Sequence, residues 1–273
     1  FVLAKMAGDY FDYRTERRER MARGEWEWNM HNHIVVVNTP DEEPVLYLRT
    51  LIRQFRAAKE FADSPVQILT PDFDGGMPAG LAEFPQVVHF NAHGTDDDAL
   101  RAVNVEQACA VVVLSRSDHD YSCDSVTFDI LHRLKGLGVA APVLAECVRD
   151  ANRARMLEAG ASIVIRPNRA YPGMVVRGFV APGSEQLMEE LFTSQGGEYR
   201  RVDVRLDGVR WEDVVTTFIK HDLGVAVAYE DTQGAIHASP PAACSVQMQA
   251  LFVMVHTDVV FAPQAIRTAV QGL

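Results

Sequence analysis

Short runs of apolar, mostly β-branched residues alternate along much of the chain with stretches whose apolar residues recur at helical spacing. Six such runs lie at 33–37, 66–70, 87–90, 108–115, 141–148 and 162–167. Between them, apolar side chains return about every three or four positions, as at Leu48, Leu51, Ile52 and Phe55. Nearly continuous apolar strands separated by helices are typical of a parallel sheet covered on both faces. The pattern predicts an α/β fold with a Rossmann-like, doubly wound parallel sheet.

The pattern changes after Pro167. The stretch 170–195 is helical in spacing, and Ala181-Pro182-Gly183 predicts a break between two helices. The tail predicts a strand over 199–206, a helix over 211–220, a hairpin about Gly234 and a strand over 250–255. We therefore expect four parts: a linker at 1–32, a Rossmann-like domain at 33–168, helical crossover at 169–197 and a smaller α+β lobe at 198–273.

The net charge of −11 is unevenly distributed. The stretch through His33 holds six basic and six acidic residues, so the excess of acid lies in the remaining residues. A nucleic-acid footprint needs the opposite sign, and no nucleic-acid partner is expected. No apolar run approaches the roughly 20 residues of a transmembrane helix. The start, FVLAKMAG, followed by the basic RTERRER, reads either as the end of a membrane helix that begins upstream or as a charged surface helix.

Polar residues follow the predicted strands directly. Ligands of open parallel sheets bind beyond the carboxyl ends of the strands, so these residues are the candidate ligand-binding set. The set consists of Asn38, Thr39, Asp72, Asn91, His93, Ser115, Arg116, Asp118 and Glu146.

The first strand is followed by NTPDEE, where a dinucleotide-binding domain usually has a glycine-rich turn. Thr39 and Glu42 have the spacing of a capping box, and Pro40 suits the first position of a helix. A turn capped in this way has no free amides for a phosphate, and its three consecutive acids repel one.

Two acidic clusters invite comparison with metal sites. Asp96-Asp97-Asp98 precedes a helix, and N-capping is the favoured interpretation. Asp118, Asp120 and Asp124 lie on the expected ligand rim, where their oxygens are candidate ligands of a hard cation, with capping as the alternative. No nucleophile elbow, zinc-protease motif or phosphate-binding loop occurs, so an enzyme is not expected.

Taken together, several segments resemble one family. They are HIVVV entered from a charged linker, DDDALRAVNVEQA (96–108), EAGASIVIRP (158–167), the crossover segment AYPGMVVRGFVAPGSEQLMEELF (170–192) and SPPA (239–242). Over about residues 30–255 the chain resembles the RCK domain, the regulator of potassium conductance, with its TrkA-N and TrkA-C-like parts.

The resemblance implies a cytoplasmic gating-ring domain of a prokaryotic potassium channel, in which ligand binding controls the pore. It also implies tethering to a transmembrane pore upstream of residue 1, pairing through the crossover helices and a homo-oligomeric ring of eight domains around a tetrameric pore. The ligand stays open between a nucleotide or dinucleotide of the NAD type and a divalent cation such as Ca²⁺. Two alternatives are a soluble regulatory subunit of a potassium transporter and a Rossmann-fold NAD-dependent oxidoreductase.

Overall fold

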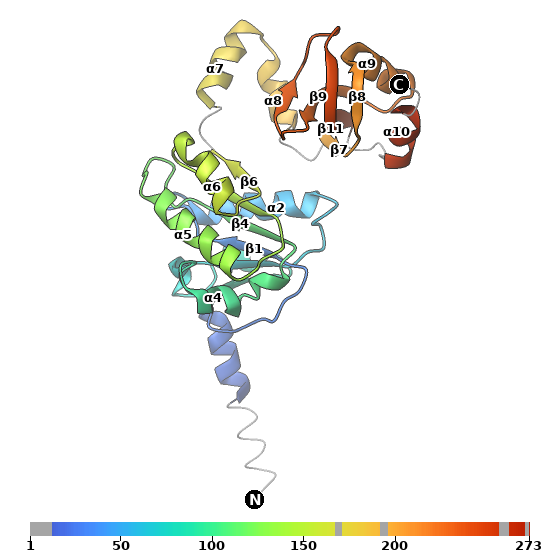
Figure 1. The fold of residues 1–273 in the computed structure, drawn as a ribbon. Helices are drawn as coiled ribbons and strands as arrows, with labels where there is room; N and C mark the ends of the chain where they lie inside the picture. Colours follow the sequence, from blue (N-terminus) through green and yellow to red (C-terminus); the bar gives the residue numbers. More distant parts are fainter. Residues whose placement is uncertain (1–12, 167–170, 192–195, 257–261, 271–272) are drawn as a thin grey trace, which may run out of the picture. The chain divides into compact units, whose positions relative to one another are not determined.

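The computed structural model describes residues 13–166, 171–191, 196–256, 262–270 and 273. The segment FVLAKMAG, with its predicted membrane-helix end, lies outside them. The chain forms two compact units, of which the first ends at Gly173 and the second begins at Met174. Each unit has its own sheet (Figure 1).

The sheet of the first unit has six parallel strands in the order β3-β2-β1-β4-β5-β6. They are β1 (Ile34–Val37), β2 (Val66–Leu69), β3 (Val87–Phe90), β4 (Ala110–Val113), β5 (Val143–Glu146) and β6 (Ile163–Ile165). Each lies within one of the six apolar runs, so the predicted doubly wound sheet is confirmed. The strand order reverses between β1 and β4, which places a ligand crevice beyond their carboxyl ends.

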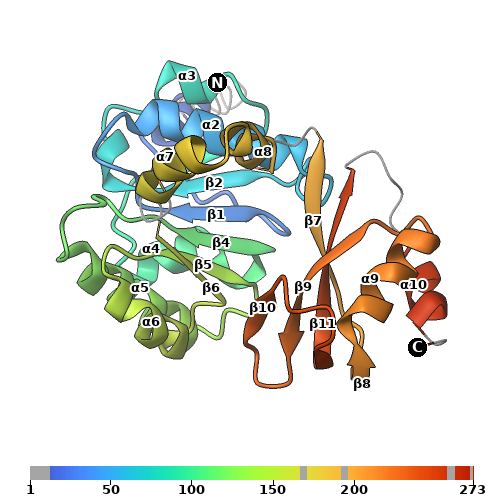
Figure 2. The ribbon, with the colours of Figure 1, turned by 90° about the horizontal axis from the view of Figure 1, so that it is seen from above.

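Helices cover both faces of this sheet (Figure 2). They are α2 (Pro44–Ala57), α3 (Ala79–Ala82), α4 (Asp97–Ala102), α5 (Cys123–Gly136) and α6 (Arg153–Ala159), with single 3₁₀ turns η1 (Pro71–Phe73), η2 (Val105–Gln107) and η3 (Asp150–Asn152). A further helix covers 13–22. Leu48 and Ile52 of α2 and Leu81 of α3 pack with Ile34 and Val36 in one core cluster. The helices α4, α5 and α6 contribute to the cluster on the opposite face.

The predicted capping box in the first turn is wrong. Helix α2 starts at Pro44, not Pro40, and its N-cap residue Glu43 has left-handed backbone angles and makes no side-chain capping bond. The reason is steric: a helix starting at Pro40 needs helical angles at Glu43, which the following proline disfavours, and needs an amide hydrogen that Pro44 lacks. Thr39 is therefore free to bond elsewhere.

The second unit contains an antiparallel sheet in the order β10-β9-β11-β7, with β8 also paired to β11. Its strands are β7 (Gly197–Val202), β8 (Leu206–Arg210), β9 (Val225–Asp231), β10 (Ile236–Ala238) and β11 (Ser245–His256). Helix α7 (Tyr171–Val180) spans the boundary between the units, and the second unit also contains α8 (Ser184–Leu191), α9 (Trp211–Lys220) and α10 (Pro263–Val270). The hydrophobic core joins Trp211, Val214 and Phe218 of α9 to Val253 and Ile266.

The break between α7 and α8, the helix over 211–220 and the hairpin about Gly234 agree with the sequence prediction. The single strand predicted over 199–206 is instead two strands, because β7 and β8 pair with opposite halves of the long β11. Across the described ranges, every helix is too short or too polar to span a bilayer.

Candidate functional site

A cleft of about 410 Å³ lies beyond the carboxyl ends of β1, β4 and β5, where the strand order reverses. Its walls come from the turn before α2, from the start of α2 and from the segments that follow β4 and β5. The lining residues that carry charge or a hydroxyl group are Asp41, Glu42, Tyr47, Ser115, Arg116, Ser117, Asp118 and Glu146. Four of the nine predicted ligand-binding residues, Ser115, Arg116, Asp118 and Glu146, thus line one cavity.

Arg116, which follows β4, connects the segments that follow β1 and β2 at one side of the cleft. Its Nη1 donates to both carboxylate oxygens of Asp72, at 3.1 and 3.0 Å, and its Nη2 donates to Oδ1 of Asp41 at 2.9 Å. The hydroxyl groups of Thr39 and Thr70 both donate to Oδ2 of Asp72. The predicted residues Thr39, Asp72 and Arg116 therefore form one closed network with Asp41 and Thr70.

The network fixes the charge of Asp72. Burial alone raises the pKa of this carboxyl group, but hydrogen bonds from Thr39 and Arg116 and the positive charge of Arg116 outweigh burial and lower the pKa below its ordinary value. Asp72 is thus an anion at neutral pH whose acceptor sites are largely occupied from within the domain. A ligand that used this carboxylate, as a ribose does in many Rossmann folds, has to compete with Arg116.

Glu146 forms the floor of the cleft and is only 5 % exposed. The Ser115 amide donates to its Oε2 at 2.9 Å, and the Tyr47 hydroxyl donates to its Oε1 at 3.0 Å. Burial raises the pKa of Glu146 and the nearby charge of Asp118 adds to the rise, against the opposite effect of the two hydrogen bonds. Burial and the neighbouring Glu146 likewise raise the pKa of Tyr47.

The other predicted residues have different surroundings. Asn38 is buried, and its Nδ2 donates to the Leu114 carbonyl at 3.4 Å, so it links the ends of β1 and β4. Asn91 and His93 follow the outermost strand, β3, and do not line the cleft. The Asn91 amide donates instead to the Gly24 carbonyl at 2.8 Å, and His93 is exposed.

The three carboxylates proposed as metal ligands do not converge. Asp118 pairs with His119 at 3.1 Å, and Asp120 caps Ser122 through its amide and its hydroxyl group. Asp124 is buried and accepts from the amides of Val148 and Arg149 and from Asn152. Within the described ranges, no group of three or more His, Cys, Asp or Glu side chains is arranged to hold a metal ion. The predicted capping role of Asp96 is confirmed by its bond to the Asp98 amide.

Sequence reasoning missed Tyr47 as a cleft residue and Asp41 as a partner of Arg116. Tyr47 lies one turn into α2 only because that helix starts at Pro44. The signal was present in the sequence, since a proline four residues after another proline excludes a helix that starts at the first one. The pairing of Asp41 with Arg116 spans 75 positions and depends on the parallel register of β1 and β4.

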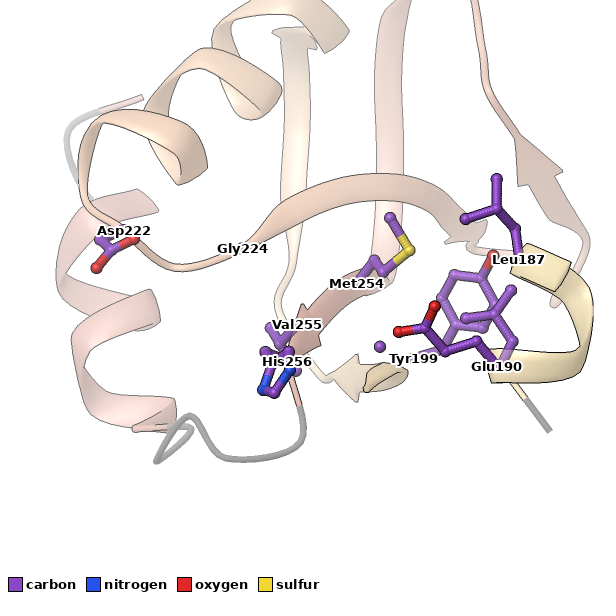
Figure 3. A pocket seen from close by; sticks show the side chains of 10 residues that line it. Leu187, Glu190, Tyr199, Asp222, Gly224, Met254, Val255 and His256 are labelled. Carbon is purple, nitrogen blue, oxygen red and sulfur yellow. The ribbon is translucent and has the colours of Figure 1, made fainter. Parts of the chain in front are cut away.

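A second cavity, of about 610 Å³, lies in the second unit (Figure 3). Leu187 and Glu190 of α8 lie on one side, with Tyr199 of β7 and Met254 of β11 beside them. His256 and the turn of Asp222 and Gly224 line it further along. It contains none of the residues predicted as ligand-binding.

Comparison with known proteins gave one family match. Residues 29–137 match the model of the calcium-activated potassium channel slowpoke-like RCK domain. No curated protein sequence matches the chain.

Several solved structures are similar to the chain. The human SLO3 gating ring is similar with a TM-score of 0.58 and 14% identity, over 86% of this chain and 46% of that one. A GsuK channel bound to NAD has a TM-score of 0.46 and 17% identity, over 96% of this chain and 44% of that one. The TrkA-N domain of the inner membrane protein YbaL from Escherichia coli has a TM-score of 0.41 and 12% identity, over 55% of this chain and 97% of that one.

This chain therefore spans less than half the length of the SLO3 and GsuK chains that it resembles. The family match covers β1 to β4 and all of α5, which include the strand-order reversal and the Arg116 network. Over residues 29–137 the chain is thus similar to the RCK domain of Slo-like potassium channels.

Proposed function

We propose that this chain is the cytoplasmic, ligand-sensing regulatory part of a potassium channel. The observation that carries the proposal is the Slo-like RCK match over residues 29–137, supported by the fold shared with a gating ring. A ligand that binds one arrangement of the domain more tightly than another shifts its conformational equilibrium. The linker at 1–32 passes that shift to a pore upstream. The role is regulatory rather than catalytic.

The proposed ligand site is the cleft beside Glu146. Its charged lining residues include Asp41, Glu42, Asp118 and Glu146, against the single Arg116, which is already paired. The Ser115 hydroxyl donates a hydrogen bond to the Ser117 carbonyl at 2.6 Å, and among the described residues neither a carboxylate nor an imidazole accepts from it to activate it as a nucleophile. The surplus of acid disfavours free phosphate and favours a ligand with positive charge. A divalent cation at this site has fewer than three convergent carboxylates among the described residues to hold it. A nucleotide or dinucleotide is the other candidate, and its phosphates require Arg116 to leave Asp41 or Asp72.

The proposed assembly is a homo-oligomeric ring that pairs through the crossover helices, with eight domains around a tetrameric pore. Helix α7 supports this proposal, because Val176, Phe179 and Val180 are 60%, 85% and 69% exposed. Apolar side chains grouped at such exposure are typical of a surface that another chain covers.

Thermal unfolding with separate additions of CaCl₂, ADP and NAD⁺ tests the ligand site. A ligand of the folded state raises the midpoint by mass action, and about 2.7 kcal/mol of stabilisation is expected at a hundred times Kd. Asp118→Asn should weaken a cation, whereas Arg116→Gln should weaken a phosphate-bearing ligand. Asp98→Asn, whose side chain is 96% exposed and lies outside the cleft, is the matched control.

The ligand proposal fails if none of the three compounds changes the midpoint. It fails equally if Asp98→Asn weakens the response as much as the cleft variants do. Recordings of the full-length protein test the wider proposal, which requires potassium current that depends on the same compound.

A further inference from the structure

The segment 21–33, called here the strap, connects the end of helix 13–22 to β1 (Figure 1). It has no regular secondary structure after residue 22. Such a connector is ordinarily flexible, because nothing fixes its backbone angles. This one makes specific contacts with the domain at both of its ends.

The strap is fastened at its start by close packing on β3. Gly24 has a φ of 71°, and its carbonyl accepts from the Asn91 amide at 2.8 Å. A Cβ at Gly24 would lie 2.5 Å from Nε2 and 2.6 Å from Cδ2 of the His89 ring. The backbone therefore lies directly against a buried imidazole whose Nε2 finds no hydrogen-bond partner among the described residues.

A second contact holds the preceding helix end. A Cβ at Gly76 would lie 2.8 Å from the Ala22 carbonyl oxygen, so the loop after η1 touches the backbone where helix 13–22 ends. Helix and strap are also joined to each other. The guanidinium groups of Arg17 and Arg20 lie 4.8 and 5.7 Å from the centre of the Trp26 ring, and the Arg20 carbonyl accepts from the Glu25 amide at 2.8 Å.

The far end of the strap is tied to the segment around η2. Asn104 Nδ2 donates to the Met30 carbonyl at 2.7 Å, and the Asn32 amide donates to the Gln107 carbonyl at 2.9 Å. His33 Nε2 lies 2.9 Å from the Val103 carbonyl. These bonds use backbone groups that a free linker offers to water, and both ends of the strap are held.

We infer that the strap is a rigid part of the domain and not a flexible connection between the domain and a pore. It acts as a lever, because helix 13–22 then moves together with the sheet. The inference rests on the proposed function only for what the lever moves. Any flexible segment that connects the ligand cleft to a pore then lies N-terminal to the strap. Asn104, Gly24 and Gly76 are the residues that make the lever stiff.

Amide hydrogen exchange on the chain by itself tests the lever without a channel. The Asn32 and Asn91 amides should exchange as slowly as amides of the sheet edge. Asn104→Gly keeps the left-handed backbone at this position, where φ is 52°, but removes the bond to Met30. It should speed exchange at Asn32 by about five- to tenfold, the effect of one lost hydrogen bond, and leave β1 and β4 unchanged. Strap amides that exchange as fast as an unstructured peptide overturn the inference.

Two neighbouring glycines give a second readout. Gly76→Ala places a methyl group against Ala22 and also strains a backbone whose φ is 102°, whereas Gly75→Ala meets nothing within 4 Å. Gly76→Ala should accelerate trypsin cleavage at Arg20 and Arg23, and Gly75→Ala should not. Equal cleavage in the two variants and the unaltered chain contradicts a stiff strap.

In full-length protein, Asn104→Gly should reduce the ligand-dependent change in open probability while Kd for the same ligand stays unchanged. An unchanged gating response alongside faster strap exchange refutes the lever. A wild-type protein without any ligand-dependent current refutes the proposed function instead.

Discussion

Arg116 joins the ends of two strands through three hydrogen bonds to carboxylate oxygens, two on Asp72 and one on Asp41. Its side chain is 37% exposed, so solvent weakens each ion pair. The main effect of the network is electrostatic, because it lowers the pKa of Asp72 and keeps this carboxyl group ionised. It also occupies the carboxylate oxygens that a ligand at the end of a strand would otherwise contact.

Arg116→Ala should raise the pKa of Asp72, because the variant loses the charge and two of the hydrogen bonds that lower it. A carboxyl whose pKa is lowered on folding adds stability above its unfolded pKa and loses that contribution as the pH falls through its folded pKa. The variant should therefore be less stable by roughly 1 kcal/mol at pH 7, and the two proteins should converge in acid. Denaturant unfolding across pH and a carboxyl-carbon NMR titration of Asp72 measure both effects.

Arg101→Ala is the control for this prediction, since Arg101 makes only a 4.0 Å contact with the exposed Asp98. A stability difference for Arg116→Ala that stayed constant down to pH 2 would mean that the network does not act through the titration of Asp72.

Helix α5 owes its position partly to a side chain that the sequence suggested as a metal ligand. Asp124 is 2% exposed and accepts from Val148 N at 2.8 Å, Arg149 N at 3.1 Å and Asn152 Nδ2 at 2.7 Å. The carboxylate therefore fastens the first turn of α5 to the segment that leaves β5. Its neighbour Asp120 serves only its own turn.

Asp124→Ala should destabilise the first unit by about 2 to 4 kcal/mol, because it leaves three donors without their acceptor in a buried place. Asp129→Ala on the same helix removes only a partly exposed pair with Arg133 and should cost less than about 0.5 kcal/mol. Chemical denaturation measures both. If Asp124 is purely structural, the change in unfolding midpoint between CaCl₂ and EDTA should be the same for Asp124→Ala as for the unaltered chain.

The elements of the first sheet were predictable because each buried strand is a short β-branched run and each helix shows its apolar stripe. The segments IVVV at β1 and AVVV at β4 strongly favour buried strands over helices or loops. The cleft was predictable as a location, since strand order determines where ligands of such sheets bind. Its contacts were not, because they depend on helix starts and on register. Glu146 accepts from Tyr47 because α2 begins at Pro44, and Asp124 accepts from Asn152 because η3 follows β5.

In the second unit, the predicted elements were wrong or missing where contacts with distant parts of the chain determine the secondary structure. Residues 199–206 look like one strand, but Asp203 to Arg205 interrupt it where β11 changes partner from β7 to β8. Helix α10 was not predicted at all. Its buried Ile266 and Val270 share a core with α9, a contact that no local pattern reveals.

Each unit has its own hydrophobic core, around the parallel sheet in the first and under the antiparallel sheet in the second. Helix α7 contributes to neither core with its apolar residues Val175, Val176, Phe179 and Val180, which are all exposed. A ring assembled through such helices has subunits joined by a surface that contributes little to the fold of one chain.

Phe179→Glu should therefore weaken self-association by at least about tenfold, the effect of losing one well-buried apolar anchor, and leave the unfolding midpoint of the monomer nearly unchanged. Sedimentation equilibrium measures the association. Ile219→Glu on α9, which is 58% exposed in the same unit, is the matched control and should leave association intact. Equal weakening by both substitutions would place the interface elsewhere.

The position of the strap has a consequence for solubility. Strand β3 is outermost in its sheet, and an open edge of that kind offers unpaired amides and carbonyls to any other strand. Met21, Ala22 and Trp28 line a hollow together with Val87, Val88 and His89 of β3, so the strap shields this edge. A shortened chain that began at His33, where the first apolar run starts, would lay the edge bare. Because Gly24 and Gly76 lie in close contact with His89 and Ala22, we expect the unaltered chain to aggregate less than one that begins at His33.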